Sequence, residues 1–430
     1  MLLQEYGSPV RLEGDAQRLL RLIEDTNIYW QNQLGLRNTP LEVAPSEDGV
    51  VRVRARGVTG QVRVGKHELH IAPKYLPPDK VERWQKSLFD MLAFANTPAF
   101  RQSSFIRGNV ETGGFIDLFA QSYAEALELA LERGAPRGYK QKQELSGTAR
   151  GRLLTEKLYP QVLENPSKLW FETDEYNKNI LLSRLLHWAC DRFATLVDDA
   201  AIRNDLLNIK QQFGDIPAQK PAGTALNRFF LSPKHRHYED PFNIAKWLAQ
   251  HQGPNLSSDE VGVPGVLLKS RTIYQGFVDT CLQKISNSNS WVYNSEPTRA
   301  LAFGAKNIST TPDHYLVVDG EGILLDSKYK GKTEWAKKEE HSGTPLRNQD
   351  VYQIMAGSRV FDTPKAVLIY PDVPSGYESS WEIEGDGLPR TLYTIKIDPV
   401  QFGRENKDDF LNEIANKLHQ IIDYELGDSD

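Results

Sequence analysis

The stretch TTPDHYLVVDGEGILLDSKYK (310–330) decides the fold of the C-terminal part of this 430-residue chain. Two apolar runs, HYLVV and GILLD, flank Asp319-Gly320, a dipeptide typical of the type I′ turn of a two-residue β-hairpin. In such a hairpin, paired residues lie at equal distances from the turn. We therefore expect Asp313 and Asp326 to face each other across two antiparallel strands.

The residues after Asp326 add a lysine to this pair. Side chains two positions apart on a strand share a face, so Asp326 and Lys328 project together. The same alternation turns Ser327 and His314 to the other face. The alternative is an ordinary solvent-exposed hairpin with charged ends.

A cation would resolve the repulsion between two opposed carboxylates. Mg²⁺ binds one or two carboxylates together with water and substrate phosphate. A lysine on the same face can hold the attacking water and offset negative charge in the transition state. The set of Asp313, Asp326 and Lys328 therefore predicts Mg²⁺-dependent phosphodiester hydrolysis.

The rest of the chain predicts a multidomain α+β or α/β protein. Hydrophobic residues make up 40% and charged residues 25%, which is typical of globular proteins, and the length suggests two or three domains. Residues 1–80 are expected to form a small β-rich domain and residues 81–255 a mostly helical middle region. The Gly- and Pro-containing stretch 253–265 marks a boundary. Residues 256–430 are expected to form an α/β domain that begins with a helix at about 266–285.

Basic residues gather in two places, although the net charge of the chain is −6. The strand-like run VVRVRAR (50–56) puts three arginines on one face, which are Arg52, Arg54 and Arg56. The segment 137–157 carries six basic and two acidic residues, the basic ones being Arg137, Lys140, Lys142, Arg150, Arg152 and Lys157. Either place can be a solvated surface or an anion-binding one. DNA-backbone contacts would make binding salt-dependent and independent of sequence.

Several other functions are disfavoured. Cys190 and Cys281 are too few for a disulfide framework or a Cys-rich zinc site, and we expect reduced, buried thiols in a cytoplasmic protein. No apolar run is long enough for a membrane span, so no membrane partner is expected. His235 and His237 form an H-x-H pair, but without a third ligand nearby a polar turn is favoured over zinc. No P-loop motif occurs, so this chain is expected to bind no nucleotide itself.

The sequence resembles the McrC family, the nuclease subunits of McrBC-type modification-dependent restriction systems, which have a PD-(D/E)xK nuclease-like domain with a mixed sheet. The resemblance spreads over much of the chain, and its most specific part is the ordered combination of LLDSKY, DVYQIMAG and LIYPD. Further matching segments are QVRVGKHELHIAPKY, LFDMLAFA, RGYKQKQELSGTARGRLL, EYNKNILLSRLL, IYQGFVDTCL and TTPDHYLVV.

The resemblance implies roles for individual residues. Asp313, Asp326 and the backbone carbonyl of Ser327 would bind Mg²⁺ or Mn²⁺, Lys328 would be the catalytic lysine, and Gln353 would contact water, metal or phosphate. Tyr329 matches the aromatic residue that follows the lysine in this family and would contact DNA or a partner. Independently of the resemblance, Lys330 and Lys332 lie in a lysine-rich segment (328–341) that either holds the scissile strand or is a solvated loop. Many nucleases of this fold carry a glutamate on the first helix of the domain. The nearest candidates here are Gln275 and Asp279, and whether either completes the site stays open.

The resemblance also implies partners. A McrB-like AAA+ GTPase ring would read modified cytosine, and this chain would dock on it, stimulate GTP hydrolysis and cut double-stranded DNA. The first 250 residues would then dock the ring, contact DNA or do both. Two alternatives stay open: an adaptor and activator of the ring with weak nuclease activity, and a standalone repair nuclease of the same fold.

Overall fold

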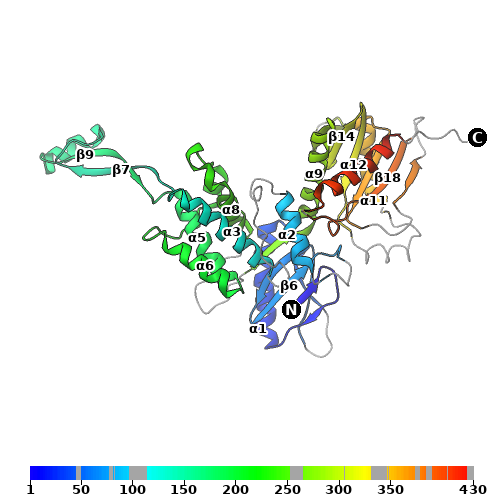
Figure 1. Ribbon diagram of the computed structural model, residues 1–430, viewed down its shortest axis with the longest axis horizontal. Coiled ribbons are helices and arrows are strands. Elements are labelled where there is room, and N and C mark those ends of the chain that lie inside the picture. The colour runs from blue at the N-terminus through cyan, green and yellow to red at the C-terminus, as the bar shows by residue number, and fades with distance from the viewer. Residues whose placement is uncertain are drawn as a thin grey trace, which may run out of the picture. The chain divides into compact units, whose positions relative to one another are not determined.

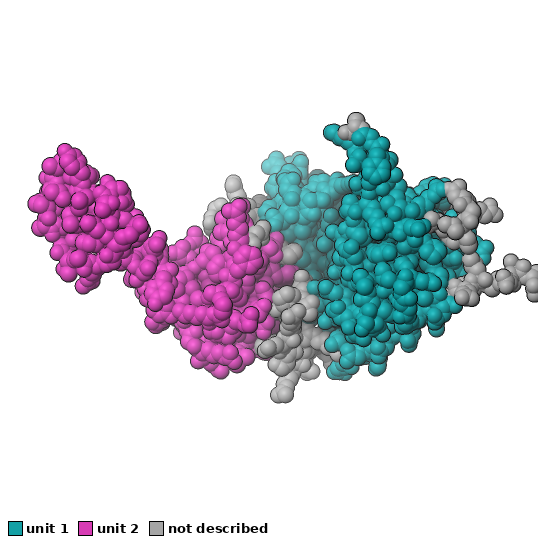
Figure 2. Space-filling model, turned by 90° about the horizontal axis from the view of Figure 1, so that it is seen from above, with its two compact units in different colours: residues 1–97, 253–430 teal, residues 98–252 magenta. Residues whose placement is uncertain are grey.

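The computed structural model describes residues 1–44, 50–76, 81, 83–95, 114–251, 265–304, 306–330, 346, 348–372, 378–383, 390–403 and 405–423. The chain divides into two compact units: residues 1–97 with 253–430 form unit 1, and residues 98–252 form unit 2 (Figure 2). Helices and several sheets occur in one chain, so the predicted α+β class is confirmed. The first and last of the three predicted parts share unit 1.

The N-terminal part of unit 1 packs a long helix on two small sheets. The helix begins after Asp15, whose side chain accepts the N–H of Arg18, and ends at Gly35, which has a φ of 59°. Trp30 of this helix is fully buried in the core shared with both sheets. The elements are α1 (Ala16–Leu34), β1 (Leu2–Gln4), β6 (His67–Ala72) and β5 (Val58–Val64) of one sheet, and β2 (Val10–Arg11), β4 (Arg52–Ala55) and β3 (Leu41–Ala44) of the other.

Strand β4 alternates as the sequence predicts. Val53 and Ala55 are buried, while Arg52 and Arg54 lie half-exposed on the other face. The strand pairs with both β2 and β3. The arginine row therefore stands on the outer face of a three-stranded sheet.

The predicted helix at 266–285 begins later than expected. Residues Gly265–Lys269 form β10, which pairs antiparallel with β5, and helix α9 (Ser270–Asn289) follows directly. The apolar run GVLLK is buried in the N-terminal sheet, where Leu267 joins the core. Backbones approach closely here: a Cβ on Gly60 would lie 2.2 Å from the Val266 carbonyl oxygen. The C-terminal segment thus completes the N-terminal sheet in the order β1-β6-β5-β10.

The C-terminal part of unit 1 is a six-stranded mixed sheet with helices around it (Figure 1). Strand β15 pairs antiparallel with β14 and parallel with β16, which in turn pairs parallel with β18. In sheet order the strands are β11 (Val292–Ser295), β14 (His314–Val318), β15 (Glu321–Ser327), β16 (Lys365–Tyr370), β18 (Arg390–Lys396) and β17 (Ser380–Ile383). The accompanying elements are α2 (Trp84–Ala95), α9, α11 (Asn348–Phe361), α12 (Lys407–Asp423) and a small ribbon of β12 (Arg299–Ala302) and β13 (Ile308–Thr310).

The central hairpin has the predicted register. Val318 pairs with Glu321, and His314 pairs with Leu325 at the other end. Asp319 and Gly320 have φ angles of 51° and 93°, as a type I′ turn requires at both central positions. Continued by one residue, this register sets Asp313 opposite Asp326.

Unit 2 is a helical body with a β-structured arm. In the body, the ring of Phe119 stacks on Trp247 with centroids 4.2 Å apart. The body contains α3 (Phe115–Glu132), α5 (Leu181–Leu196), α6 (Ala200–Gln211), α7 (Gly223–Arg228), the 3-10 helix η3 (Pro233–Tyr238) and α8 (Glu239–His251). The arm (138–177) contains β7 (Gly138–Ser146), β8 (Arg152–Leu153), the 3-10 helix η2 (Thr155–Lys157), α4 (Leu158–Glu164) and β9 (Leu169–Asn177).

The arm is β-structure within the middle region that was expected to be mostly helical, and it includes most of the basic segment 137–157. Strand β7 pairs with β9 along its whole length, from Gly138 opposite Asn177 to Ser146 opposite Leu169. Figure 1 shows these two strands extending from the helices of unit 2. Strand β7 is mostly polar on both faces, which is why the hydrophobic pattern gave no strand signal there.

Candidate active site

The structure brings Asp313 and Asp326 together. Asp326 lies on β15 and is 1% exposed, and Asp313 lies just before β14. The main-chain N–H of Ser327 donates to Oδ2 of Asp313 across 2.9 Å. Burial and then the negative charge of Asp326 raise the pKa of Asp313 to about 6. The two carboxylates therefore repel each other as their facing positions predict.

Lys328 and Gln353 join this pair from two different elements. The ammonium of Lys328 forms an ion pair with Asp326, and it donates to Oε1 of Gln353 across 3.2 Å. Gln353 is an exposed residue of α11, which packs on the face of the sheet that carries Leu324. Because side chains two apart share a face, Asp326 and Lys328 point to the same side as Leu324, toward α11. The four residues predicted to be catalytic thus form one cluster.

The cluster has the donor set of a hard divalent cation. Oδ1 of Asp326 is buried and accepts no hydrogen bond from the residues that the structure describes. A buried carboxylate oxygen without a donor is costly, and a bound cation would compensate it. Across the described residues, no group of three or more His, Cys, Asp or Glu side chains is arranged to hold a metal. A site with two carboxylates suits Mg²⁺, which keeps several waters.

Gln275 lies at the carboxylate pair. Its side-chain amide donates to Oδ1 of Asp313 across 3.1 Å and approaches Oε1 of Glu296 at 3.4 Å. The amide therefore holds the Asp313 carboxylate from α9, while Ser327 holds its other oxygen. Gln275 stands where a glutamate ligand was considered from the sequence, and it serves in this structure as a donor.

Asp279 belongs to a separate network. Its Oδ1 accepts hydrogen bonds from the hydroxyls of Tyr293 and Ser295, each at 2.5 Å. Burial alone would raise the pKa of Asp279, but hydrogen bonds from His314, Ser295 and Tyr293 lower it to about 2. The Asp279 carboxylate is therefore hydrogen-bonded to these donors and does not join the Asp313–Asp326 pair.

The hydrogen bonds of Asp279 continue through Tyr293 and His314 to Ser327 on β15. The Tyr293 hydroxyl also lies 2.7 Å from Nδ1 of His314, and Nε2 of His314 lies 2.7 Å from Oγ of Ser327. Since Ser327 follows Asp326 on the strand and its side chain contacts His314, both side chains lie on the face opposite Asp326, as alternation predicts. Sequence reasoning missed Tyr293 and Ser295. Tyr293 and Ser295 are two positions apart in the run VYNS, which becomes β11 beside β14. This spacing places both side chains on one face and was the signal available in the sequence.

Tyr329 and Lys330 were predicted to contact DNA or a partner, but each makes a polar contact inside the protein. The Tyr329 hydroxyl donates to Oε2 of Glu5 across 2.7 Å. Lys330 is 8% exposed and forms an ion pair with Asp350. The polar groups of both side chains are therefore engaged within unit 1. Lys332 lies outside the described residues.

Both predicted basic surfaces reach the solvent, the arginines of β4 only in part, and both carry acidic neighbours. Arg56 pairs with Glu42 at 3.0 Å on the outer face of the N-terminal sheet. In the arm, Arg152 pairs with Glu172 at 3.1 Å, and Lys140 stands opposite Glu175 in the β7–β9 register. The remaining predicted contacts in and beside the arm, Arg137, Lys142 and Arg150, are also exposed. Strand β9 thus partly neutralises the positive charge of the segment 137–157.

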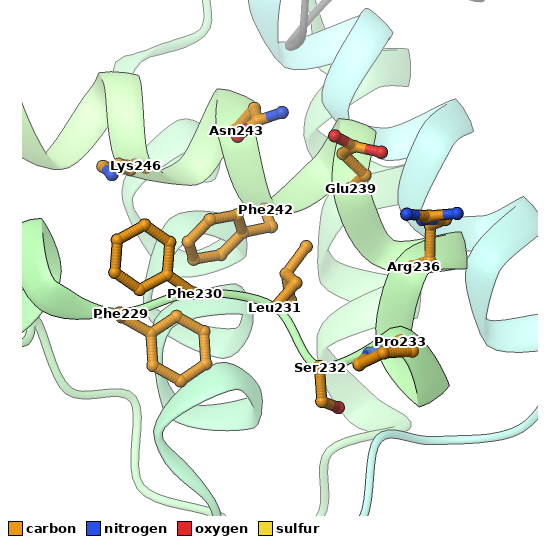
Figure 3. A pocket seen from close by; sticks show the side chains of 10 residues that line it. All are labelled: Phe229, Phe230, Leu231, Ser232, Pro233, Arg236, Glu239, Phe242, Asn243 and Lys246. Carbon is orange, nitrogen blue, oxygen red and sulfur yellow. The ribbon is translucent and has the colours of Figure 1, made fainter.

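Unit 2 contains a pocket of a different kind. Figure 3 shows Phe229, Phe230 and Phe242 on one side, with Arg236 and Glu239 on the other. Glu239 is the one acidic residue among those that line this pocket, so the pocket has no pair of carboxylates for metal-dependent chemistry.

His235 belongs to the H-x-H pair considered as a zinc site. Its ring nitrogens lie 3.0 Å from the carbonyl of Arg137 and 3.1 Å from the hydroxyl of Ser232. Both ring nitrogens thus have local partners, as in a polar turn.

The fold and the site define an α+β protein that presents two carboxylates, a lysine and a glutamine at a mixed sheet. The family of the McrBC 5-methylcytosine restriction system component matches residues 53–371, and the chain belongs to this family. No curated protein matches the chain. In the described ranges, every helix is too short or too polar to cross a membrane.

Two solved structures match this chain. One is a half-complex from a tetradecameric assembly of Thermococcus gammatolerans McrB AAA+ hexamers with bound McrC. It matches with a TM-score of 0.68 and 16% sequence identity over 97% of this chain and 99% of that chain. The other is the Thermococcus gammatolerans McrBC complex, with a TM-score of 0.47 and 17% identity over 66% of this chain and 87% of that chain. The first match establishes that the fold extends over almost the whole chain.

Proposed function

We propose that the chain is the endonuclease subunit of a modification-dependent restriction system and cuts double-stranded DNA by Mg²⁺-dependent phosphodiester hydrolysis. The C-terminal part of unit 1 would be its PD-(D/E)xK nuclease domain. One observation carries the proposal: Asp313, just before β14, faces Asp326 on β15, and Lys328 and Gln353 join this pair. Membership of the McrBC family agrees with it.

Each residue of the cluster has a chemical role in this proposal. Asp313, Asp326 and the backbone carbonyl of Ser327 would hold Mg²⁺, which when bound polarises the phosphoryl oxygens of the scissile group. Lys328 would hold the attacking water and offset negative charge that develops on the phosphate. Gln353 keeps the ammonium of Lys328 at the site through the 3.2 Å hydrogen bond. Gln275 and the N–H of Ser327 orient the carboxylate of Asp313.

We further propose that the chain works on a McrB-type AAA+ GTPase ring. The solved assembly with the same fold contains McrB AAA+ hexamers with bound McrC. Unit 2 is a compact unit of its own and suits docking on a partner or on DNA. Tyr159 and Leu163 on α4 of the arm are 79% and 71% exposed, and apolar side chains in such positions are common at interaction surfaces.

The test is cleavage by variants of the site in the assembled complex. Lys328→Ala and Asp326→Ala should each abolish DNA cleavage, while ring binding and stimulation of GTP hydrolysis persist. Lys417→Ala is the control and should cut normally. Lys417 lies on α12 and pairs with Glu378 at 2.9 Å. If the two site variants cut as well as the control, the cluster of Asp313, Asp326, Lys328 and Gln353 is not the nuclease site.

A further inference from the structure

The residue after the candidate catalytic lysine is bound by the N-terminal sheet. Tyr329 follows Lys328 beyond the end of β15, and its hydroxyl donates to Oε2 of Glu5 across 2.7 Å. Glu5 directly follows β1 and is 2% exposed. Both residues belong to unit 1, although 324 positions separate them in the chain. The contact therefore joins the N-terminal sheet to the strand that carries Asp326 and Lys328.

Lys74 and two tyrosines complete the surroundings of Tyr329. The main-chain N–H of Lys74 lies 3.3 Å from the Tyr329 hydroxyl and 3.4 Å from Oε2 of Glu5. The ammonium of Lys74 lies 4.7 Å from the centre of the Tyr329 ring. The rings of Tyr75 and Tyr274 pack against it with centroids 6.3 and 5.9 Å away. The orientation of Tyr329 is thus determined by both polar and aromatic contacts.

Joining two parts of the chain through a buried carboxyl group stabilises the fold less than apolar packing would. Burial raises the pKa of Glu5 to about 7, even though the nearby charge of Lys74 opposes this. A buried carboxyl group contributes less to stability than an apolar side chain of similar size would. What a hydrogen bond adds over apolar packing is direction, because it restricts where the Tyr329 hydroxyl, and with it the backbone at 329, can lie.

The backbone of Lys328 is consequently held on both sides. On one side its N–H donates to the carbonyl of Ile369 across 2.8 Å, which continues the ladder between β15 and β16. On the other side, the next residue is tied to Glu5. A lysine side chain is long and flexible, so its ammonium is placed accurately only if its backbone is rigid. Small displacements of a catalytic group have large effects on rate.

We propose that Glu5 and Tyr329 are positioning residues of the nuclease site: the Glu5–Tyr329 hydrogen bond sets the placement of Lys328 beside Asp326. The N-terminal sheet is then part of the catalytic apparatus of the C-terminal domain. The inference rests on the proposed function, because it assigns the placement of a lysine that must act in cleavage.

The first test is Tyr329→Phe in the full chain assembled with its McrB-type ring. Phenylalanine keeps the ring and its packing and removes only the hydroxyl. We expect the maximal rate of DNA cleavage to fall about tenfold or more. The DNA concentration for half-maximal rate, the stimulation of GTP hydrolysis and the assembly with the ring should not change. A wild-type maximal rate for Tyr329→Phe would overturn the inference.

Tyr75→Phe is a matched control for the loss of a buried tyrosine hydroxyl. The Tyr75 hydroxyl lies in the same aromatic cluster, but it contacts Oγ of Ser87 and Sδ of Met91, each at 3.0 Å. This variant should unfold at a lower temperature and still cleave at the wild-type maximal rate. If Tyr75→Phe and Tyr329→Phe lose the same fraction of that rate, the cluster has only a structural role and the inference is wrong.

Two substitutions of Glu5 test the acceptor. Glu5→Gln keeps an oxygen that accepts from Tyr329 and should cleave at close to the wild-type maximal rate, whereas Glu5→Ala should behave like Tyr329→Phe. A slow Glu5→Gln beside a fast Glu5→Ala would contradict the positioning role. Lys328→Ala separates this inference from the proposed function: if that variant cuts DNA, the proposed site itself is wrong.

Discussion

The main-chain N–H of Ser327 donates a 2.9 Å hydrogen bond to the carboxylate of Asp313, so the backbone of one strand orients the side chain of its neighbour. The same residue turns its own side chain to the opposite face, where Oγ lies 2.7 Å from Nε2 of His314. Ser327 therefore links the acidic pair to the network behind the sheet. Because the donor to Asp313 is the backbone N–H, any residue except proline at position 327 can supply it.

Ser327→Ala should separate these two roles. The N–H to Asp313 and the backbone carbonyl remain, so DNA cleavage should persist at low temperature. His314 loses the partner of its buried Nε2, which should destabilise the fold by about 1–3 kcal/mol. Thermal unfolding measures the loss, and the exposed Ser309→Ala on β13 is the control. Complete loss of cleavage by a folded Ser327→Ala protein would assign the side chain a direct role.

Asp313→Asn should stabilise the protein in the absence of divalent metal. At pH 7.5 the Asp313 carboxylate is ionised although burial and Asp326 raise its pKa to about 6. Removing the charge relieves this repulsion, and unfolding in EDTA should require about 1–2 kcal/mol more. Stabilisation by added Mg²⁺ and DNA cleavage should both disappear.

The control for Asp313→Asn lies on the same hairpin. Asp319→Asn makes the same chemical change at the turn, where asparagine tolerates the positive φ of 51°. This variant should keep the Mg²⁺-dependent rise in unfolding temperature. An Asp313→Asn protein that still gains stability from Mg²⁺ as the wild type does would rule out Asp313 as a ligand.

The hairpin and its acidic pair were predictable because their determinants are local. Asp319-Gly320 specifies a two-residue turn, and the turn specifies the register that sets Asp313 opposite Asp326. Strand alternation then places Lys328 beside Asp326 and turns His314 away. Each of these steps needs only neighbouring positions in the sequence.

The parts that were not predicted depend on partners far away in the chain. Gly265–Lys269 continues directly into helix α9, and its pairing with β5 is what makes it a strand. Strand β7 is mostly polar on both faces, and its acidic partner β9 lies beyond a turn and a helix. From the sequence alone, Glu5 would be taken for an ordinary surface residue, because no neighbouring residue in the chain indicates its contact with Tyr329.

Glu5→Gln should change the pH dependence of stability. Folding raises the pKa of Glu5 from 4.5 to about 7 through burial. Below pH 4.5 the carboxyl is protonated in both states and costs nothing. As the pH rises toward 7, the unfolded state ionises freely while the folded state resists, so the folded wild type loses stability. Glutamine does not titrate, so its stability relative to wild type should increase by about 2–3 kcal/mol across this range. Denaturant unfolding at pH 4.5, 6 and 8 measures the difference, and a constant difference would contradict the buried environment of Glu5.

Gln275→Glu should convert a donor at Asp313 into a third carboxylate. Without metal, the new charge beside Asp313 should destabilise the fold by roughly 1 kcal/mol, because like charges now replace a hydrogen bond. With metal, the added charge should lower the Mg²⁺ concentration needed for half-maximal cleavage. Mg²⁺ titrations of cleavage and of unfolding temperature measure both effects. The proposed metal position would be wrong if the required Mg²⁺ concentration stayed the same or increased.

The arm offers a comparison between two arginines two residues apart. Arg150 is exposed, whereas Arg152 pairs with Glu172 at 3.1 Å and is partly neutralised. If the arm follows a DNA backbone, Arg150→Ala should weaken binding and lower the slope of log affinity against log salt by about 0.9. Arg152→Ala should change that slope less, because Glu172 already offsets its charge. Binding of double-stranded DNA across a salt series measures both slopes, and stimulation of the ring's GTP hydrolysis is measured in parallel. Loss of stimulation by Arg150→Ala with an unchanged salt slope would assign the arm to docking on the ring, and no change in either would leave it a solvated surface.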